Sequence, residues 1–354
     1  MLERTNGSPP SDAKNARGSE TMATDSLNLG KGLDVGTTNL VAAFEDEHGD
    51  VVINLERNAF LDIKSDPFTR SMLSKQKIPY AVHKDSLYVL GQSSFEFANI
   101  VGREVRRPMS DGTISPTEAD ALPVVRLLVE KLLGPPRHDK EPLCISVPAS
   151  PVDMTMNVDY HTGILLNLGN RMGYQALAIP EGLAVVYSEL GDQEFSGIGI
   201  SFGGGMANVC IAYKSVPAIA FSVGRSGDWI DRNAAQVLGS RSSRITLLKE
   251  RGLNLASPKS REEEAIVIFY RNLLHYVADK IYQFMVTSKA MPEFPGPVEL
   301  VCSGGTTLVT GFLEVLQDEF SKIDFPIPIK VIRIAEDPLN STVRGCMLAA
   351  ISST

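Results

Sequence analysis

Three glycine-rich turns, each following an apolar run, contain the residues of this sequence that are best suited to chemistry. They occupy residues 34–39 (DVGTTN), 201–206 (SFGGGM) and 303–306 (SGGT). Glycines allow positive φ and let an anion approach backbone N–H groups, to which threonine hydroxyls add further donors. Asp34 is a carboxylate of the kind that holds Mg²⁺ through its water shell. Each turn alone could be an ordinary tight turn, but together they predict two phosphate clamps and a loop for a nucleoside.

The elements that must position these turns form an α/β pattern that occurs twice. Residues 31–55 alternate apolar and polar types around two turns, which predicts three strands. Residues 197–213 predict a second strand hairpin, and residues 216–239 predict a strand that enters a helix. Helical periods follow in both halves. Ser115 and Ser150 match the N-cap pattern for helices that begin directly after them, while the stretch around Pro67 looks less regular. We therefore expect an α/β fold with duplicated domains and a cleft between two lobes.

The composition is that of an ordinary globular protein and argues against several classes. The 354 residues suffice for two domains, with 43% hydrophobic and 21% charged residues. The net charge of −8 argues against nucleic acid as a partner, and no apolar run reaches the roughly 18 residues of a transmembrane segment. Residues 1–28 are polar, and we expect a disordered tail without a signal peptide. The four cysteines lack metal-ligand spacing, which favours reduced thiols in a cytoplasmic protein.

The ordered set of motifs resembles the actin-like ATPase superfamily, in particular the bacterial actins of the MreB and MamK type. Residues 33–39 (LDVGTTN) resemble the first phosphate loop of that family, and residues 301–312 (VCSGGTTLVTGF) resemble its adenosine loop. Residues 106–115 (RRPMSDGTIS) resemble its Arg-Pro-x-x-Asp-Gly-x-Ile stretch, and residues 336–350 resemble its final helix. The resemblance covers residues 31–353 and implies a two-lobed, actin-like (ribonuclease H-like) fold.

The resemblance also divides the chain. It implies a first actin-like lobe at residues 29–178, after the tail of residues 1–28. A second lobe, with a reduced upper subdomain, would follow at residues 179–335. Residues 336–354 would form a C-terminal helix that returns to the first lobe.

Each motif residue acquires an expected role from the same resemblance. Asp34 would organise the water ligands of Mg²⁺, and Glu181 would position the water that attacks the terminal phosphate. The nucleotide would be ATP or ADP, with GTP as an alternative, and it would contact Asp34, Gly36, Thr37, Thr38, Asn39, Ser201, Gly203, Gly204, Gly205, Gly227, Lys249, Glu250, Gly304, Gly305 and Thr306. Two plainer interpretations stay open: Glu181 could simply favour a helix dipole, and Lys249 and Glu250 could be an ordinary exposed helix pair.

Two departures from the family pattern bear on activity. The second phosphate loop of the family usually begins with Asp, but here Ser201 stands in that place and Met206 replaces a threonine. Loss of one electrostatic element typically slows catalysis by about 10²–10³-fold, so we expect nucleotide binding with slow hydrolysis. Bacterial actins usually carry a small sheet subdomain before the long helix that follows residue 260. Its reduction here argues against ordinary actin-like polymerisation.

Two functional hypotheses follow from these features. The motif set favours a nucleotide-dependent protein that self-assembles into cytoskeletal or scaffold filaments and binds further, unidentified protein partners. Ser201 and the reduced subdomain favour a non-polymerising ATP-binding switch or a degenerate ATPase. A sugar kinase would need an Asp base that the sequence does not offer, and a chaperone ATPase would need a C-terminal substrate domain. We favour the filament former, because function in this family follows assembly more than turnover.

Overall fold

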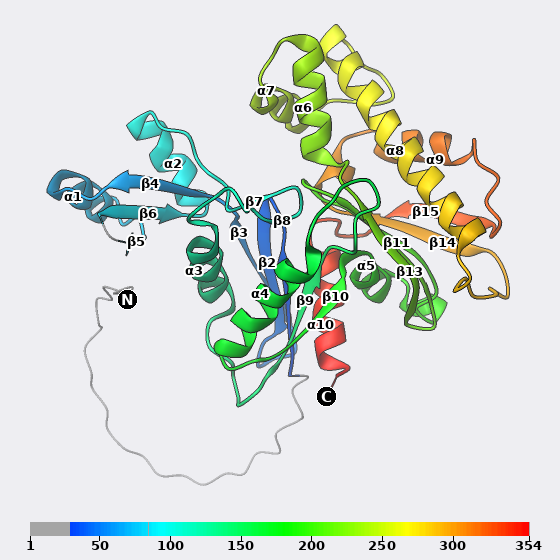
Figure 1. The fold of residues 1–354 in the computed structure, drawn as a ribbon, viewed down its shortest axis with the longest axis horizontal. Helices are drawn as coiled ribbons and strands as arrows, with labels where there is room; N and C mark the ends of the chain where they lie inside the picture. The colour runs from blue at the N-terminus through cyan, green and yellow to red at the C-terminus, as the bar shows by residue number, and fades with distance from the viewer. Residues whose placement is uncertain (1–28, 84, 354) are drawn as a thin grey trace.

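The computed structural model describes residues 29–83 and 85–353, so the prediction for residues 1–28 lies outside the described residues. A five-stranded mixed sheet forms the centre of the first lobe, in the order β10-β9-β1-β2-β3 (Figure 1). Strands β1, β2 and β3 are antiparallel neighbours, whereas β1, β9 and β10 run parallel. The strands are β1 (Lys31–Val35), β2 (Asn39–Glu45), β3 (Val51–Arg57), β9 (Pro142–Val147) and β10 (Gln175–Pro180).

A second five-stranded sheet repeats this plan and forms the centre of the second lobe. Its order is β13-β12-β11-β14-β15, again with three antiparallel neighbours followed by two parallel strands. The strands are β11 (Gly197–Phe202), β12 (Ala207–Tyr213), β13 (Val216–Val223), β14 (Val298–Ser303) and β15 (Ile329–Ile334). The equal order and direction of the strands confirm the predicted duplicated α/β fold.

Two helices pack between the sheets and join the lobes. Helix α5 (Glu181–Glu189) packs on β11 and β12, helix α10 (Ser341–Ile351) packs on β1 and β9, and the two helices pack on each other (Figure 1). Their contact is close, because a Cβ atom on Gly345 would lie 1.8 Å from the carbonyl oxygen of Ala184. Only glycine fits at this crossing, so the relative position of the lobes is set by close backbone packing.

The alternation of strand β2 explains how the first sheet is covered on both faces. Leu40 and Ala42 belong to a core shared with helices α3 (Ala121–Leu133) and α4 (Val158–Arg171). Val41 and Ala43 point the other way and pack against residues of α10. Since neighbouring residues of a strand face opposite sides, a strand buried on both faces reads as a continuous apolar run. In the second lobe, α6 (Gly227–Leu238), α8 (Arg261–Thr287) and α9 (Phe312–Phe320) contribute to one large core.

Smaller elements extend both lobes. In the first lobe a three-stranded sheet and two helices project away from the main sheet (Figure 1); they are β4 (Phe60–Lys64), α1 (Pro67–Lys75), β5 (Tyr80–His83), β6 (Ser86–Leu90) and α2 (Gln92–Val101). The hairpin of β7 (Met109–Ser110) and β8 (Thr113–Ile114) follows. In the second lobe, residues 239–260 contain helix α7 (Ser242–Glu250) and no strand. None of the helices in residues 29–83 and 85–353 is both long and apolar enough to cross a membrane.

The start of helix α3 was predicted wrongly. The helix begins at Ala121, with Asp120 in the cap position, and not directly after Ser115. Glu118 does not return to Ser115, because its carboxylate accepts hydrogen bonds from Arg106 (Nε to Oε2, 2.9 Å) and from the N–H of Asp120 (to Oε1, 3.1 Å). A partner outside the local sequence therefore overrides the local capping pattern.

The prediction for helix α4 was also wrong. Asn157 caps this helix, since its Oδ1 atom accepts a hydrogen bond from the N–H of Tyr160 at 2.8 Å. Ser150 instead lies beside the edge of β13, where its carbonyl accepts a hydrogen bond from the N–H of Ser222 at 3.1 Å. The irregular interpretation around Pro67 was wrong for a different reason, because a local cap was overlooked: Asp66 caps α1 by accepting from the N–H of Thr69 at 2.8 Å.

Candidate functional site

The first two glycine-rich turns face each other across the two lobes. The turn after β1 is closed by a hydrogen bond from the Gly36 N–H to the Asn39 carbonyl, at 3.0 Å. The turn after β11 is closed in the same way, from the Gly203 N–H to the Met206 carbonyl, also at 3.0 Å. The structure thus places two equivalent turns at equivalent ends of the duplicated sheets.

Glycine is required in the second turn because the first turn lies against it. A Cβ atom on Gly204 would lie 2.7 Å from the Thr38 hydroxyl oxygen, and one on Gly205 would lie 2.6 Å from the Thr37 hydroxyl oxygen. The Cβ atom on Gly205 would also lie 2.2 Å from the backbone nitrogen of Gly112, which cannot move aside as a side chain can, so the need for glycine is strictest there. The hydroxyls of the first lobe therefore contact the backbone of the second, as expected of two loops that close on one ligand.

Four backbone N–H groups at this contact have no acceptor. Within residues 29–83 and 85–353, the N–H groups of Thr37, Thr38, Gly204 and Gly205 donate no hydrogen bond. Thr37 and Gly205 are buried, where backbone N–H groups are nearly always paired with an acceptor, whereas Thr38 and Gly204 are partly exposed. Consecutive N–H groups in turns form a concave donor site for an anion. The arrangement therefore fits a phosphate group held from both lobes.

A cluster of carboxyl and hydroxyl groups lies beside the turns. Asp34, at the end of β1, accepts a hydrogen bond from the Ser146 hydroxyl at 2.6 Å. Glu181, the first residue of α5, accepts one from the Ser201 hydroxyl at 2.9 Å. Burial raises the pKa of both acids, and Asp34 raises the pKa of Glu181 further, to about 8, against the lowering effect of Ser201 and Asn208. Two carboxyls that repel each other in a desolvated site would gain from a cation.

Two buried amides next to these groups are only partly satisfied. Asn208 is 1% exposed, and its Oδ1 atom accepts from the Ala149 N–H at 3.2 Å. Its Nδ2 group, close to Glu181, meets no acceptor at hydrogen-bond geometry among the described residues. Asn58 donates from Nδ2 to the Gly36 carbonyl at 2.8 Å, while its buried Oδ1 atom has no donor in the described part of the chain. Such unsatisfied buried polar atoms indicate a place for ordered water or a ligand.

The second turn is anchored to helix α6 and to the third glycine-rich loop. The Gly203 carbonyl accepts from the hydroxyls of Ser226 at 2.5 Å and of Thr306 at 2.8 Å. A Cβ atom on Gly227 would lie 2.8 Å from the Thr306 hydroxyl, so the helix start and the loop are in contact. Gly304 has a φ of +97° and lies on the backbone of Phe202. The three predicted loops therefore meet, and Gly305 opens the short 3-10 helix η2 (Gly305–Leu308) beside them.

Of the remaining predicted residues, only some have side chains that contact other predicted site residues. The Lys249 side chain is 11% exposed, lies 2.6 Å from the Asp231 carboxylate (Nζ to Oδ1) and donates to the Gly227 carbonyl at 3.2 Å. Its neighbour Glu250 is exposed. Within the described part of the chain, the Glu250 side chain forms no hydrogen bond or ion pair. Asn39 accepts from Arg57 at 3.2 Å, so its side chain is held by the adjacent strand.

A magnesium ion would find few protein ligands here. The described residues contain no group of three or more His, Cys, Asp or Glu side chains that could hold a metal ion. Mg²⁺ typically keeps several waters and uses one or two carboxylates together with substrate phosphates. Asp34 and Glu181 match that requirement, and their raised pKa values are consistent with a site that lacks positive charge.

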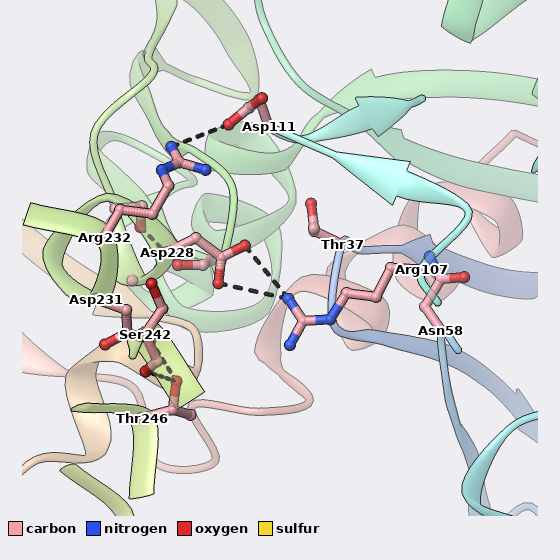
Figure 2. Close-up of polar contacts among 12 residues, drawn as sticks. Thr37, Asn58, Arg107, Asp111, Asp228, Asp231, Arg232, Ser242 and Thr246 are labelled. Atoms are coloured by element: carbon pink, nitrogen blue, oxygen red, sulfur yellow. Dashed lines mark hydrogen bonds and ion pairs between the residues drawn. The ribbon is translucent and has the colours of Figure 1, made fainter. Parts of the chain in front are cut away.

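Ser146, Asn208 and Asn58 belong to the site but were not predicted from the sequence. Ser146 and Asn208 are polar residues within otherwise apolar, buried strands, and this was the available signal for them. Asn58 follows β3, a strand of mixed polarity that is only partly buried, so the sequence offered no such signal for it. Buried polar side chains need partners, which here are Asp34, the Ala149 N–H and the Gly36 carbonyl. Side-chain pairs that cross the cleft were also missed; Figure 2 shows Arg107 beside Asp228, and Arg232 beside Asp111.

Duplicated α/β lobes with facing turns at equivalent strand ends define an actin-like protein. The structure is similar to that described as "MamK double helical filament", with a TM-score of 0.69 and 18% identity over 91% of this chain and 98% of that chain. It is similar to MreB 5 of Spiroplasma citri bound to AMPPNP, with a TM-score of 0.63 and 15% identity over 89% of this chain and 94% of that chain. At these identities the likeness concerns the fold.

A third similar structure is the ethanolamine utilization protein EutJ from Carboxydothermus hydrogenoformans. Its TM-score is 0.51 and its identity 15%, over 91% of this chain and 89% of that chain. No curated protein sequence matches this chain. The family model described as Volactin matches residues 29–350, and the chain therefore belongs to the Volactin family.

Proposed function

We propose that this chain is an actin-like nucleotide-binding protein that self-assembles into cytoskeletal or scaffold filaments in the cytoplasm and hydrolyses ATP slowly. The observation that carries the nucleotide claim is the set of four unpaired N–H groups, two from each lobe. A bound triphosphate would give each of them an acceptor and would join the lobes. Structures with this fold have been determined with AMPPNP and with ADP, which supports the same ligand class here.

The residues of the turns would divide the work of binding. Thr37, Thr38, Gly204 and Gly205 would hold the phosphates, and Asp34 would hold Mg²⁺ through water, with Glu181 beside it. Bound Mg²⁺ would neutralise phosphate charge. Gly227, Gly305 and Thr306 would form the floor for the nucleoside, with Lys249 at its edge.

Slow hydrolysis follows from the state of Glu181. An ionised carboxylate can both orient the attacking water and accept a proton from it, whereas a protonated carboxyl can only orient it. In the nucleotide-free cluster, burial and Asp34 raise the pKa of Glu181 to about 8, and the Ser201 hydroxyl donates a hydrogen bond to Oε2 of Glu181. Binding therefore depends on backbone groups that are present, whereas cleavage depends on a carboxyl that is poorly prepared for it.

The filament claim rests on a different feature, namely the likeness to a filament subunit over nearly the whole of both chains. Head-to-tail contacts between identical subunits generate open filaments when the rotation does not close. The alternative is a non-polymerising ATP-binding switch or a degenerate ATPase. Two observations favour it: Ser201 in the place of a carboxylate, and the absence of any strand in residues 239–260.

Two measurements test the proposal. Millimolar ATP or ADP with Mg²⁺ should raise the melting temperature, because a ligand that binds only the folded state stabilises it; parallel titrations with GTP test the base preference. Absence of any shift with all three nucleotides would contradict nucleotide binding. Sedimentation and electron microscopy with ATP, with ADP and without nucleotide test assembly. Monomers in all three conditions would select the switch hypothesis.

A further inference from the structure

Two ion pairs connect the lobes beside the phosphate turns. Arg107 of the first lobe lies 3.4 Å from Asp228 of α6 (Nη1 to Oδ2), and Arg232 of α6 lies 3.1 Å from Asp111 of the first lobe (Nη2 to Oδ1) (Figure 2). Among the ion pairs of residues 29–83 and 85–353, these two are the ones that join the first lobe to the second. We call them the cleft ion pairs.

The geometry of the cleft ion pairs is matched on both sides. Asp228 and Arg232 are four residues apart on α6, so their side chains lie on one face of the helix. Arg107 and Asp111 lie on either side of strand β7. Each lobe therefore presents one acid and one base in an order that fits the other lobe, and a shifted closure would bring like charges together.

Each pair is also linked to one of the phosphate turns. The N–H of Asp228 donates to the Gly204 carbonyl of the second turn at 2.8 Å. Next to Asp111, the N–H of Gly112 donates to the Thr37 hydroxyl of the first turn at 3.1 Å. Separation of the lobes at the ion pairs would therefore pull the two turns apart.

We propose that the cleft ion pairs control nucleotide release by holding the two phosphate turns together. This inference rests on the proposed nucleotide binding. A nucleotide held between the turns leaves when the lobes separate, and separation breaks both pairs. The release rate then depends on the ionic strength, because the pairs are reached by solvent: the four side chains are between 26% and 52% exposed.

The expected effect is modest and measurable. Partly exposed ion pairs have small coupling energies, which correspond to an increase of about 2- to 5-fold in release rate when one pair is lost. The Asp111–Arg232 pair is the better target, because Asp228 also donates its backbone N–H to the Gly204 carbonyl of the second turn, whereas Asp111 forms no such hydrogen bond in the described part of the chain. Asp111 has a φ of +47°, which Asn also tolerates, so Asp111→Asn removes the charge without new backbone strain.

The experiment compares Asp111→Asn, Arg232→Gln and the double variant with the unchanged chain. Displacement of a fluorescent ATP analogue in a stopped-flow instrument gives the release rate. Spin labels on Glu96→Cys and Ser243→Cys, both exposed and on opposite lobes, give the interlobe distance without nucleotide. The four native cysteines are buried, so labelling is directed to the new sites. Arg244→Gln is the control, because it breaks a pair with Glu262 of similar exposure within one lobe.

The proposal expects both single variants to release the analogue about 2- to 5-fold faster and to widen the interlobe distance distribution. The double variant should release the analogue at the same rate as the single variants, because the two charges act on each other. In 0.5 M salt the release rates of the variants and of the unchanged chain should differ less. Three outcomes would overturn the proposal: an unchanged release rate in the single variants, a change in the double variant equal to the sum of the single changes, or an equal change in Arg244→Gln. If the unchanged chain binds no analogue, nucleotide binding has failed; unchanged interlobe distances in the variants would then separately refute the role of the pairs.

Discussion

Replacement of Glu181 by Gln should make the nucleotide-free protein more stable at pH 8, although it removes a proposed catalytic group. Burial and the neighbouring Asp34 raise the pKa of Glu181 from 4.5 to about 8. The folded state therefore holds a proton that the unfolded state loses near pH 4.5. Stability contributed by this group is complete below pH 4.5 and is lost as the pH rises to about 8. Gln keeps the shape and the acceptor for Ser201 but cannot titrate.

The size of the effect follows from that pH interval. Each pH unit between 4.5 and about 8 lowers the free energy of unfolding by ~1.4 kcal/mol for one group. The full interval corresponds to an upper bound of about 5 kcal/mol. Burial also raises the pKa of Asp34, so the two acids share the titration. We therefore expect the free energy of unfolding of Glu181→Gln to exceed that of the unchanged chain by about 3 kcal/mol at pH 8 and to equal it at pH 4.5.

Urea unfolding at half-unit steps from pH 4.5 to 8.5, without nucleotide or divalent cations, measures this difference. Glu189→Gln is the matched control, because it lies on the same helix α5 and pairs with Arg333 at 2.7 Å. Its loss should destabilise the protein by a similar amount throughout this range. Parallel pH profiles for Glu181→Gln and the unchanged chain would show that Glu181 is ionised in the folded state, and the argument for slow hydrolysis would fail with it.

Three further predictions use other parts of the structure. Ser201→Asp should lower the melting temperature without Mg²⁺ and raise ATP turnover with Mg²⁺, whereas the uncharged Ser201→Asn should not raise turnover; equal turnover in both variants would contradict a role for the missing carboxylate. Gly345→Ala should lower the free energy of unfolding by about 2–4 kcal/mol, because its Cβ atom would lie 1.8 Å from the Ala184 carbonyl oxygen. Gly163→Ala, with nothing within 4 Å, should raise it by about 0.5–1 kcal/mol in the same urea assay; equal effects would refute the packing argument. Burial lowers the pKa of His161 to about 4, so stability should fall by ~1.4 kcal/mol per unit as the pH drops from 6.5 to 4, and His161→Leu should remove this slope from the urea profile; an unchanged slope would exclude His161 as its source.

The strands and the glycine-rich turns could be predicted because local sequence determines them. The turns after β1 and β11 need glycine for close approach, and the strands on both sides are apolar runs. The true starts of helices α3 and α4 were missed, because the cap patterns at Ser115 and Ser150 compete with other hydrogen-bond partners of the same residues. Glu118 is bound by Arg106, and Ser150 lies along β13.

Several site residues depend on partners that are distant in the sequence. Ser146 and Asp34 are 112 residues apart, and their hydrogen bond exists only because β1 and β9 are neighbours in the sheet. The same holds for Asn208, whose Oδ1 atom accepts a hydrogen bond from the distant Ala149 N–H. The Lys249–Glu250 pair was suggested by resemblance alone, and of the two only Lys249 contacts a predicted site residue, the Gly227 carbonyl at the start of α6. Strand order therefore determines which polar residues form the site, and single-sequence patterns do not contain it.

The duplication explains why a serine is tolerable where a carboxylate was expected. Asp34 lies opposite Ser146 of the neighbouring parallel strand, and Ser201 lies opposite Ser303 in the second sheet, so Asp34 and Ser201 occupy equivalent positions. A carboxylate at both positions would place two acids beside Glu181, three in all, and their repulsion would favour a bound cation. Ser201 instead donates a hydrogen bond to Glu181. Ser201 therefore keeps the repulsion in the nucleotide-free cluster lower, and the N–H groups of both turns do not depend on it. In the proposed function, binding and cleavage therefore use different groups: the backbone N–H groups of the turns for binding, and a carboxylate that Ser201 does not supply for cleavage.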